Sequence, residues 1–235
     1  MSTQVRNKVV GMLRPKAVLF DAYGTLFDVY SVAHAAEQLF PGRGEKLALL
    51  WRDKQIEYTR LLTMSGRYQT FWEITCAALR YAVQRFELRL DPAGEAHLLN
   101  QYRHLSAFPE NKAVLAELKQ RGIPAGILSN GDPAMLAVAV KSAGFEELLS
   151  HVLSVDAVKR FKTDPQAYSL GPRALGLPAR EILFVSSNCW DAIGATWYGH
   201  TTLWVNRAGT PLEQLDTAPT RTGTTLRDVL TFFPS

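Results

Sequence analysis

The chain has 235 residues, enough for one large domain or for a core with a smaller cap. Hydrophobic residues make up 47% and charged residues 20%, which is ordinary for a soluble globular enzyme. Lysine and arginine total 26 against 22 acidic residues, and these charges are scattered without a basic run, so nucleic acid is not expected as a partner.

The N-terminal residues 1–14 hold an apolar patch too short for a signal peptide, and no stretch of the chain approaches the roughly 20 apolar residues of a membrane span. We therefore expect a loosely held extension on a cytoplasmic protein with no membrane partner.

The first predicted element is a strand that ends on a carboxylate. Residues 16–20 are mostly apolar and lead into Asp21, which a Gly-Thr turn soon follows. This pattern predicts a buried strand with Asp21 at its carboxyl end, where open α/β sheets bind ligands.

The next segment is predicted to be helical. It has no proline between Pro41 and Pro92 and is rich in Leu, Ala, Glu, Gln and Arg. Its apolar residues recur at helical spacing over residues 47–61, 71–86 and 95–105. A helical block directly after the first strand indicates an insertion, so we expect a helical cap subdomain over residues 29–105.

Alternation of strands and helices resumes after Pro109. Strands are predicted over residues 123–129, 151–154, 182–186 and 202–206, and helices over residues 111–122, 133–143, 164–175, 191–198 and 226–233. Elements of these lengths in alternation indicate an α/β fold with a doubly wound parallel sheet. We expect this Rossmann-like core to comprise residues 15–28 and 106–235.

Four polar segments fall where such a sheet would bring them to one crevice. They are Asp21, Ser129-Asn130-Gly131, the Lys162 segment and Ser186-Ser187-Asn188-Cys189-Trp190-Asp191. Their order resembles the four motifs of the haloacid dehalogenase superfamily. The run Ser-Ser-Asn-x-Trp-Asp, together with Arg52 and Tyr168, resembles the L-2-haloacid dehalogenases within that superfamily. The resemblance extends over roughly residues 18–207, and the motifs are specific only in combination.

The resemblance implies that Asp21 is a nucleophile whose carboxylate displaces halide and forms an ester, which water then hydrolyses. Phosphatases of the superfamily have a second Asp two residues later to protonate the departing alkoxide, and this chain has Tyr23 there. A halide leaving group needs no proton, so Tyr23 favours carbon–halogen cleavage. Without the other motifs, Asp21 would equally suit a turn or a helix cap.

The resemblance also implies how the nucleophile and the substrate carboxylate are held. Lys162 would keep Asp21 ionised, because a nearby cation favours the charged carboxylate. Thr25 and Ser129 would donate hydrogen bonds to Asp21 or to the substrate, although both hydroxyls could simply cap the following segments. Backbone N–H groups of Ala22 and Tyr23 would bind the substrate carboxylate.

Further residues are implied for the halide and for the attacking water. Arg52 on the cap helix would meet the departing halide, with Asn130 as a second donor; helical periodicity alone would make Arg52 a solvated surface residue. Asp191 would orient or deprotonate the water. Supporting hydroxyl and amide groups would come from Tyr168, Ser186, Ser187 and Asn188.

The apolar side of the pocket is expected to be formed by Tyr23, Ile56, Phe71 and Trp190, which would exclude water from the carboxylate. Of these, Phe71 could be plain core. The five histidines show no metal-ligand spacing, and we expect neither a metal ion nor an organic cofactor.

The sequence thus predicts an enzyme that converts short (S)-2-haloalkanoates to (R)-2-hydroxyalkanoates and halide, and the resemblance suggests a homodimer formed through the cap helices. Two alternatives stay open at this point. One is a magnesium-dependent phosphatase on the same fold, and the other is an inactive superfamily member that serves as a binding module. The preferred halogen, the chain length of the substrate and the effects of Thr163 and Asp53 cannot be read from the motifs.

Overall fold

A parallel sheet forms the centre of the protein. The computed structural model describes residues 14–234, so nearly all of the extension predicted for residues 1–14 lies outside the described residues. The sheet has six strands in the order β3-β2-β1-β4-β5-β6, and every neighbouring pair is parallel. The strands are β1 (Ala17–Phe20), β2 (Ala125–Ser129), β3 (His151–Ser154), β4 (Ile182–Ser186), β5 (Thr201–Val205) and β6 (Arg221–Gly223). The prediction of a doubly wound parallel sheet is confirmed.

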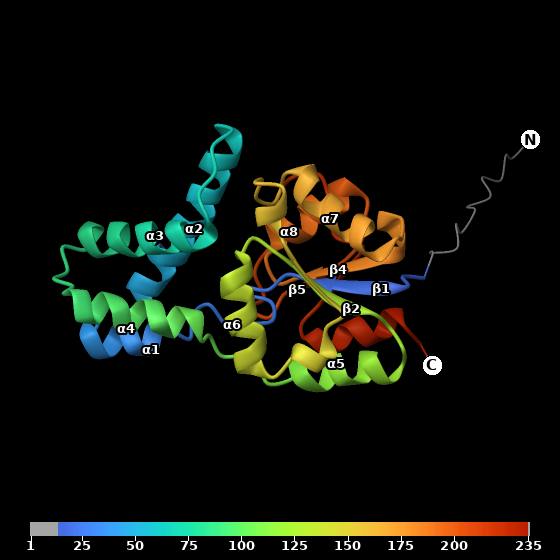
Figure 1. The fold of residues 1–235 in the computed structure, drawn as a ribbon, viewed down its shortest axis with the longest axis horizontal. Helices are drawn as coiled ribbons and strands as arrows, with labels where there is room; N and C mark the ends of the chain where they lie inside the picture. The colour runs from blue at the N-terminus through green and yellow to red at the C-terminus, as the bar shows by residue number, and fades with distance from the viewer. Residues whose placement is uncertain (1–13, 235) are drawn as a thin grey trace, which may run out of the picture.

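Helices cover both faces of this sheet (Figure 1). α7 (Pro165–Leu175) and α8 (Cys189–Tyr198) lie over one face, and α5 (Asn111–Gln120) lies over the other beside the closing 3-10 helix η4 (Leu226–Phe232). α6 (Pro133–Ala143) packs beside the edge strand β3. The residues of β1, β2 and β4 are all buried, because parallel strands lie between two layers of helices.

Two elements of this core differ from the sequence-based expectation. The closing segment was expected as a helix over residues 226–233, and it forms a 3-10 helix that stops before Pro234. Proline lacks a backbone N–H and cannot continue a helix, so the element ends before it. β6 was not predicted, since it has three residues, two of them exposed, and therefore carries no apolar signal.

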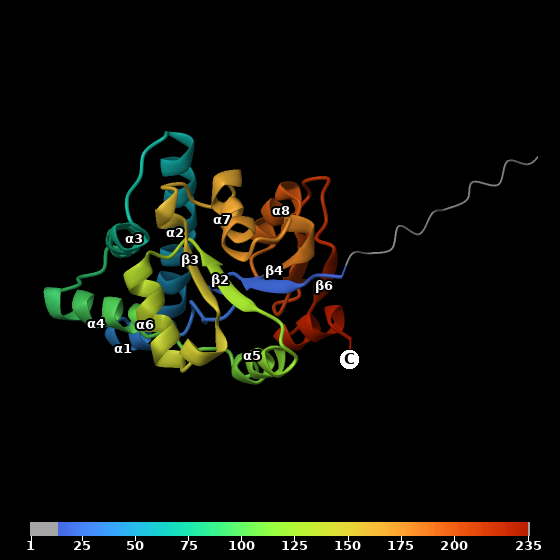
Figure 2. The same ribbon diagram turned by 45° about the vertical axis from the view of Figure 1, so that its right-hand side comes forward.

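The segment between β1 and α5 forms four helices that stand at one end of the sheet (Figures 1 and 2). They are α1 (Ala33–Leu39), α2 (Gly44–Met64), α3 (Phe71–Arg85) and α4 (Pro92–Arg103). α1 was not predicted; it has seven residues and no side-chain cap, so its sequence signal is weak. The three predicted helices are present, and Thr70 with Glu73 forms a capping box at the start of α3.

The two ends of this helical segment meet. The backbone N–H of Asp28 donates a hydrogen bond to the carbonyl of Ser106 at 2.8 Å, and Phe27 pairs with Ala107 in an isolated antiparallel bridge. The chain therefore leaves the core and returns to it at one place.

Hydrogen bonds also join the far side of the helical segment to the core. The carbonyl of Thr63 at the end of α2 accepts from Arg160, and the Thr63 hydroxyl accepts from the N–H of Phe161. The Tyr68 hydroxyl donates to Asp156 at 2.7 Å. Among residues 14–234, no helix is both long enough and apolar enough to cross a membrane.

Candidate active site

The crevice of the sheet lies between β1 and β4, the neighbouring strands from which the chain winds outward in opposite directions. Ligands of doubly wound folds bind at this switch point, outside the carboxyl ends of the strands. Asp21 follows β1 directly, and Ser186 ends β4. The first and fourth polar segments of the sequence therefore meet here.

Asp21 is buried, with 6% of its surface exposed, and both of its oxygens are held. Its Oδ1 accepts from the Lys162 ammonium at 3.0 Å. Its Oδ2 accepts from the Thr25 hydroxyl at 3.0 Å and from Nδ2 of Asn188 at 2.9 Å. Gly24 takes a positive φ of 96°, which favours glycine, and this turn brings Thr25 back to Asp21. These donors stabilise the ionised carboxylate and fix its direction.

Lys162 lies between two carboxylates. Its Nζ is 3.0 Å from Oδ1 of Asp21 and 3.0 Å from Oδ2 of Asp191, and its side chain is fully buried. Burial opposes the charge, but the two carboxylates outweigh this and raise the pKa of Lys162. The lysine is therefore a permanent cation beside Asp21.

Asp191 forms the fully buried inner end of this network and does not line the cavity described below. Its Oδ1 accepts from the Tyr168 hydroxyl at 2.8 Å, and its Oδ2 accepts from Lys162. Burial raises the pKa of Asp191 to about 6, although Lys162 opposes the rise. A carboxylate with such a pKa is suited to take up a proton near neutral pH.

Arg52 reaches the same crevice from α2. The residue is 7% exposed, and its guanidinium donates to the carbonyl of Tyr23 at 3.0 Å. A longer contact of 3.4 Å joins Nη2 to Oδ1 of Asn188. Among residues 14–234, no carboxylate lies within 4.0 Å of it. A buried cation without an anionic partner is costly, so the site is prepared for an anion. Asp53 is exposed and does not line the cavity.

These groups line a small cavity whose empty space measures about 290 Å³. The lining residues are Asp21, Tyr23, Arg52, Ile56, Thr59, Phe71, Ser129, Asn130, Asn188 and Trp190. All four predicted wall residues are among them, so the structure brings the carboxylate, the arginine and the apolar side chains around one space. The lining side chains leave little free room in this space, so the cavity suits only a small ligand.

Several donors around the cavity are unused. No hydrogen bond from the N–H groups of Ala22 and Tyr23 is found among the described residues. The Ser129 hydroxyl accepts from the N–H of Gly131 at 3.0 Å and does not donate to Asp21, so its proton can serve a ligand. Oδ1 of Asn130 accepts from the N–H of Lys162 at 3.0 Å, which leaves its NH2 group as a donor. Free donors beside a cavity suit a carboxylate ligand.

The remaining predicted residues support the loop after β4 and the start of α8. The Ser186 hydroxyl accepts from the N–H of Asn188 at 3.1 Å, and the N–H of Ser187 donates to the Thr25 hydroxyl at 2.8 Å. Ser186 and Ser187 therefore act on the conformation of neighbouring residues, and neither is hydrogen-bonded to Asp21.

The sequence did not single out Thr59, Arg207 and Tyr102. Thr59 follows Arg52 and Ile56 at helical spacing on α2, and that spacing could have revealed it. Arg207 donates to the Ser187 hydroxyl at 2.7 Å and to the carbonyl of Thr25 at 3.2 Å, contacts between distant parts of the chain that carry no local signal. Tyr102 stacks on Tyr23 with a ring separation of 5.9 Å.

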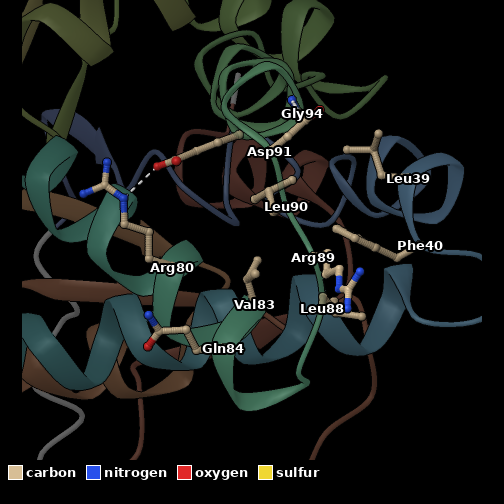
Figure 3. A pocket seen from close by; sticks show the side chains of 11 residues that line it. Leu39, Phe40, Arg80, Val83, Gln84, Leu88, Arg89, Leu90, Asp91 and Gly94 are labelled. Atoms are coloured by element: carbon tan, nitrogen blue, oxygen red, sulfur yellow. Dashed lines mark hydrogen bonds and ion pairs between the residues drawn. The ribbon is translucent and has the colours of Figure 1, made fainter.

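A larger groove lies within the helical segment, between α1, α3 and α4 (Figure 3). Its polar side chains have structural partners: Asp91 caps α4, and Glu95 pairs with Arg80 at 2.7 Å. No nucleophile is placed there by an adjacent cation or base. The convergent polar groups assign the active site to the smaller cavity.

No group of three or more His, Cys, Asp or Glu side chains within residues 14–234 is arranged to hold a metal ion. The space between the two carboxylates of the site is taken by the Lys162 ammonium.

Comparison with known proteins gives consistent similarities. A family model described as haloacid dehalogenase-like hydrolase matches residues 15–199. The (S)-2-haloacid dehalogenase of Pseudomonas sp. (strain YL) is 44% identical over 218 residues, which cover 93% of this chain and 94% of that protein. A crystal structure of an L-2-haloacid dehalogenase has a TM-score of 0.91 and 59% identity, covering 93% of this chain and 98% of its own. The L-2-haloacid dehalogenase of Xanthobacter autotrophicus with chloropropionic acid covalently bound has a TM-score of 0.87 and 37% identity, covering 94% of this chain and 100% of its own.

Proposed function

The chain belongs to the haloacid dehalogenase-like hydrolases, and within them to the L-2-haloacid dehalogenases, hydrolases that act on carbon–halide bonds; from this premise we propose how its own residues carry out the reaction. The substrates are short (S)-2-haloalkanoates, and the products are (R)-2-hydroxyalkanoates and halide. The observation that carries the proposal is the buried Asp21 carboxylate, held by Lys162 at 3.0 Å and facing a small cavity that it shares with Arg52.

In the first step, an oxygen of Asp21 attacks the halogen-bearing carbon. A carbon–oxygen bond forms while the carbon–halogen bond breaks, and the halide leaves with the bonding electrons. The attack comes from the side opposite the halogen, so the carbon is inverted. The substrate carboxylate binds the free donors of Ser129, Ala22 and Tyr23, which holds the carbon in line with Asp21.

Arg52 stabilises the departing halide in this step. The charge that Asp21 loses on forming the ester appears on the halide, and the buried guanidinium has no carboxylate partner among the described residues. Stabilising a charge that develops during bond breaking lowers the barrier itself. Asn130 offers its free NH2 group as a second donor.

In the second step, water attacks the carbonyl carbon of the Asp21 ester. Asp191 accepts the proton of the water, either directly or through the network of Lys162 and Tyr168. The bond between this carbonyl carbon and the transferred oxygen then breaks, and the departing oxygen takes a proton to become the hydroxyl of the product. The stereocentre is not touched, so the overall result is inversion.

Four further properties belong to the same proposal. The reaction needs no metal ion, because Lys162 occupies the space between the two carboxylates. Residues 29–105 act as a cap on a core of residues 15–28 and 106–235, and the bond between Asp28 and Ser106 supports this boundary. We also propose a cytoplasmic homodimer in which the cap helices of two copies meet.

Substitution of the nucleophile tests the proposal. Asp21→Asn should lower halide release from (S)-2-chloropropionate to background, because an amide oxygen is a poor nucleophile, while the thermal unfolding curve stays cooperative. A single turnover of the wild-type enzyme in water enriched in heavy oxygen should place the label in Asp21, as read by mass spectrometry of the peptide. If the label enters the hydroxy acid directly, the ester mechanism is wrong.

A further inference from the structure

A second cavity lies behind the catalytic one and shares a wall with it. Its empty space measures about 880 Å³, part of it open to solvent, and Arg52 and Asn188 line both cavities. We call this space the vestibule. It is bounded by the turns after β1 and β5, with Gly24 and Arg207 among its lining residues.

The vestibule is lined by buried residues at one end and by exposed residues at the other. At its inner end, Arg52 is 7% exposed. At its outer end, Tyr30 is 47% exposed, and Ala208 and Thr210 are also exposed. The cavity therefore leads from the proposed halide-binding arginine to solvent.

The direct contact across the partition between the two cavities is long. Nη2 of Arg52 lies 3.4 Å from Oδ1 of Asn188, beyond the usual length of an N–H···O hydrogen bond. Asn188 is itself fixed, since its Nδ2 donates to Asp21 at 2.9 Å. A rotation of the Arg52 guanidinium would break its bond of 3.0 Å to the carbonyl of Tyr23 and open the partition, but it would leave the bond between Asn188 and the nucleophile intact.

The charges of the vestibule favour passage of an anion along Arg52. The second cation, Arg207, is neutralised by Glu110 at 3.0 Å, and the Asp28 carboxylate also lines the space. Arg52 has no carboxylate within 4.0 Å in the described part of the chain, so an anion is held most strongly beside it. On the other side the halide would have to pass the ester and the apolar side chains of Ile56 and Phe71, which solvate an ion poorly.

We infer that the vestibule is the exit route of the halide, with the contact between Arg52 and Asn188 as its gate. This inference rests on the proposed function, because it takes Arg52 as the residue that receives the leaving group. On this route, the halide passes Ala208 and Thr210 on its way from the active site to solvent.

Iodide binding measured by stopped-flow tryptophan fluorescence tests the route without turnover. Trp190 lines the catalytic cavity, so bound iodide should give a saturable, time-resolved quenching phase. A residue on a route changes the association and dissociation rates together, whereas a residue of the binding site changes their ratio. The variants are Ala208→Phe, Thr210→Phe and their combination, which narrow the outer end at exposed positions.

We expect both rate constants of the combined variant to fall by about threefold or more with an unchanged Kd. The matched control Ala218→Phe, exposed in the same C-terminal region but not lining the vestibule, should keep wild-type rates. Unchanged rates in all three variants, a changed Kd, or no saturable phase in the wild-type protein would each overturn the route. The proposed function is tested separately by halide release from 2-chloropropionate, so failure of one is distinguishable from failure of the other.

Discussion

Lys162 connects the two acidic residues of the site. It is buried, and its ammonium is 3.0 Å from both Asp21 and Asp191. Without this cation two carboxylates would face each other across a buried space, and like charges at such a distance favour protonation of one of them.

Lys162→Met should therefore abolish catalysis. We expect kcat to fall by about three orders of magnitude or more, because the variant loses the positioned charge that holds Asp21 and Asp191 in place. Ion chromatography of released halide would measure the loss, and circular dichroism would show whether the fold is kept. A variant that keeps more than a tenth of the wild-type rate would contradict the role of Lys162.

The pKa of Asp191 predicts the acid side of the pH profile. Burial raises this pKa to about 6, and the ionised form is the one that accepts the proton of water. In the ester, Asp21 carries no charge, and this removes one cause of the rise in the pKa of Asp191. The rate of ester hydrolysis should therefore fall at a pH somewhat below 6, by about tenfold for each further pH unit. Single-turnover decay of the ester, followed by mass spectrometry from pH 4 to pH 8, measures this fall.

Tyr168→Phe gives a matched comparison for the same profile. The hydrogen bond of 2.8 Å from Tyr168 to Asp191 lowers the pKa of the carboxyl group, so its removal should move the acid limb to higher pH. If the rate of ester hydrolysis falls at the same pH in this variant as in the wild-type enzyme, a group other than Asp191 is responsible for the fall.

The sequence predicted some of these residues better than others. Asp21 and Ser129 could be placed because each ends a strand of a parallel sheet, and such ends meet at one edge. Arg52 was identified only through the family resemblance, since helical periodicity does not tell which polar side chain turns inward. The support of Thr25 by Arg207 joins residues 182 positions apart and depends on the finished fold.

Among the elements, α2 contributes most to the site. Arg52, Ile56 and Thr59 line the cavity from one side of this helix, and Thr63 near its end bonds the segment that leads into Lys162. The helix was predicted from its amphipathic pattern. Its neighbour α1 was missed because seven residues without a side-chain cap leave too little pattern.

Thr63→Val tests whether α2 positions this segment. The change removes the acceptor of the Phe161 N–H at 3.1 Å, and we expect the protein to lose about 1 kcal/mol of stability, as for one unsatisfied donor. We also expect kcat to fall several-fold, because Phe161 precedes Lys162. Urea unfolding and halide release would measure the two effects.

Thr63→Ser is the control for that variant. It keeps the hydroxyl and should restore both stability and kcat to nearly wild-type values. If the serine variant loses as much stability and activity as the valine variant, the hydrogen bond to Phe161 does not account for the loss.

At the scale of the whole molecule, the cap also presents an apolar surface. Leu61 and Met64 lie about one turn apart near the end of α2 and are 53% and 85% exposed. Large exposed apolar side chains close together are typical of interaction surfaces. They are consistent with the proposed dimer.

The combined variant Leu61→Asp and Met64→Asp should weaken this dimer. Sedimentation of the wild-type protein should give twice the chain mass of 26.2 kDa, and the variant should shift toward 26.2 kDa, because a charge buried in an apolar interface is unfavourable. A variant that still sediments as a dimer would place the interface elsewhere.

The paired residues at the base of the cap have a practical consequence. Because Asp28 and Ser106 are hydrogen-bonded neighbours, the register of β1 and β2 does not depend on how many helices lie between them. Another set of helices could be grafted at this junction and would place new walls opposite the same nucleophile. The junction is thus the natural point at which to recombine relatives when redesigning which haloacids the enzyme accepts.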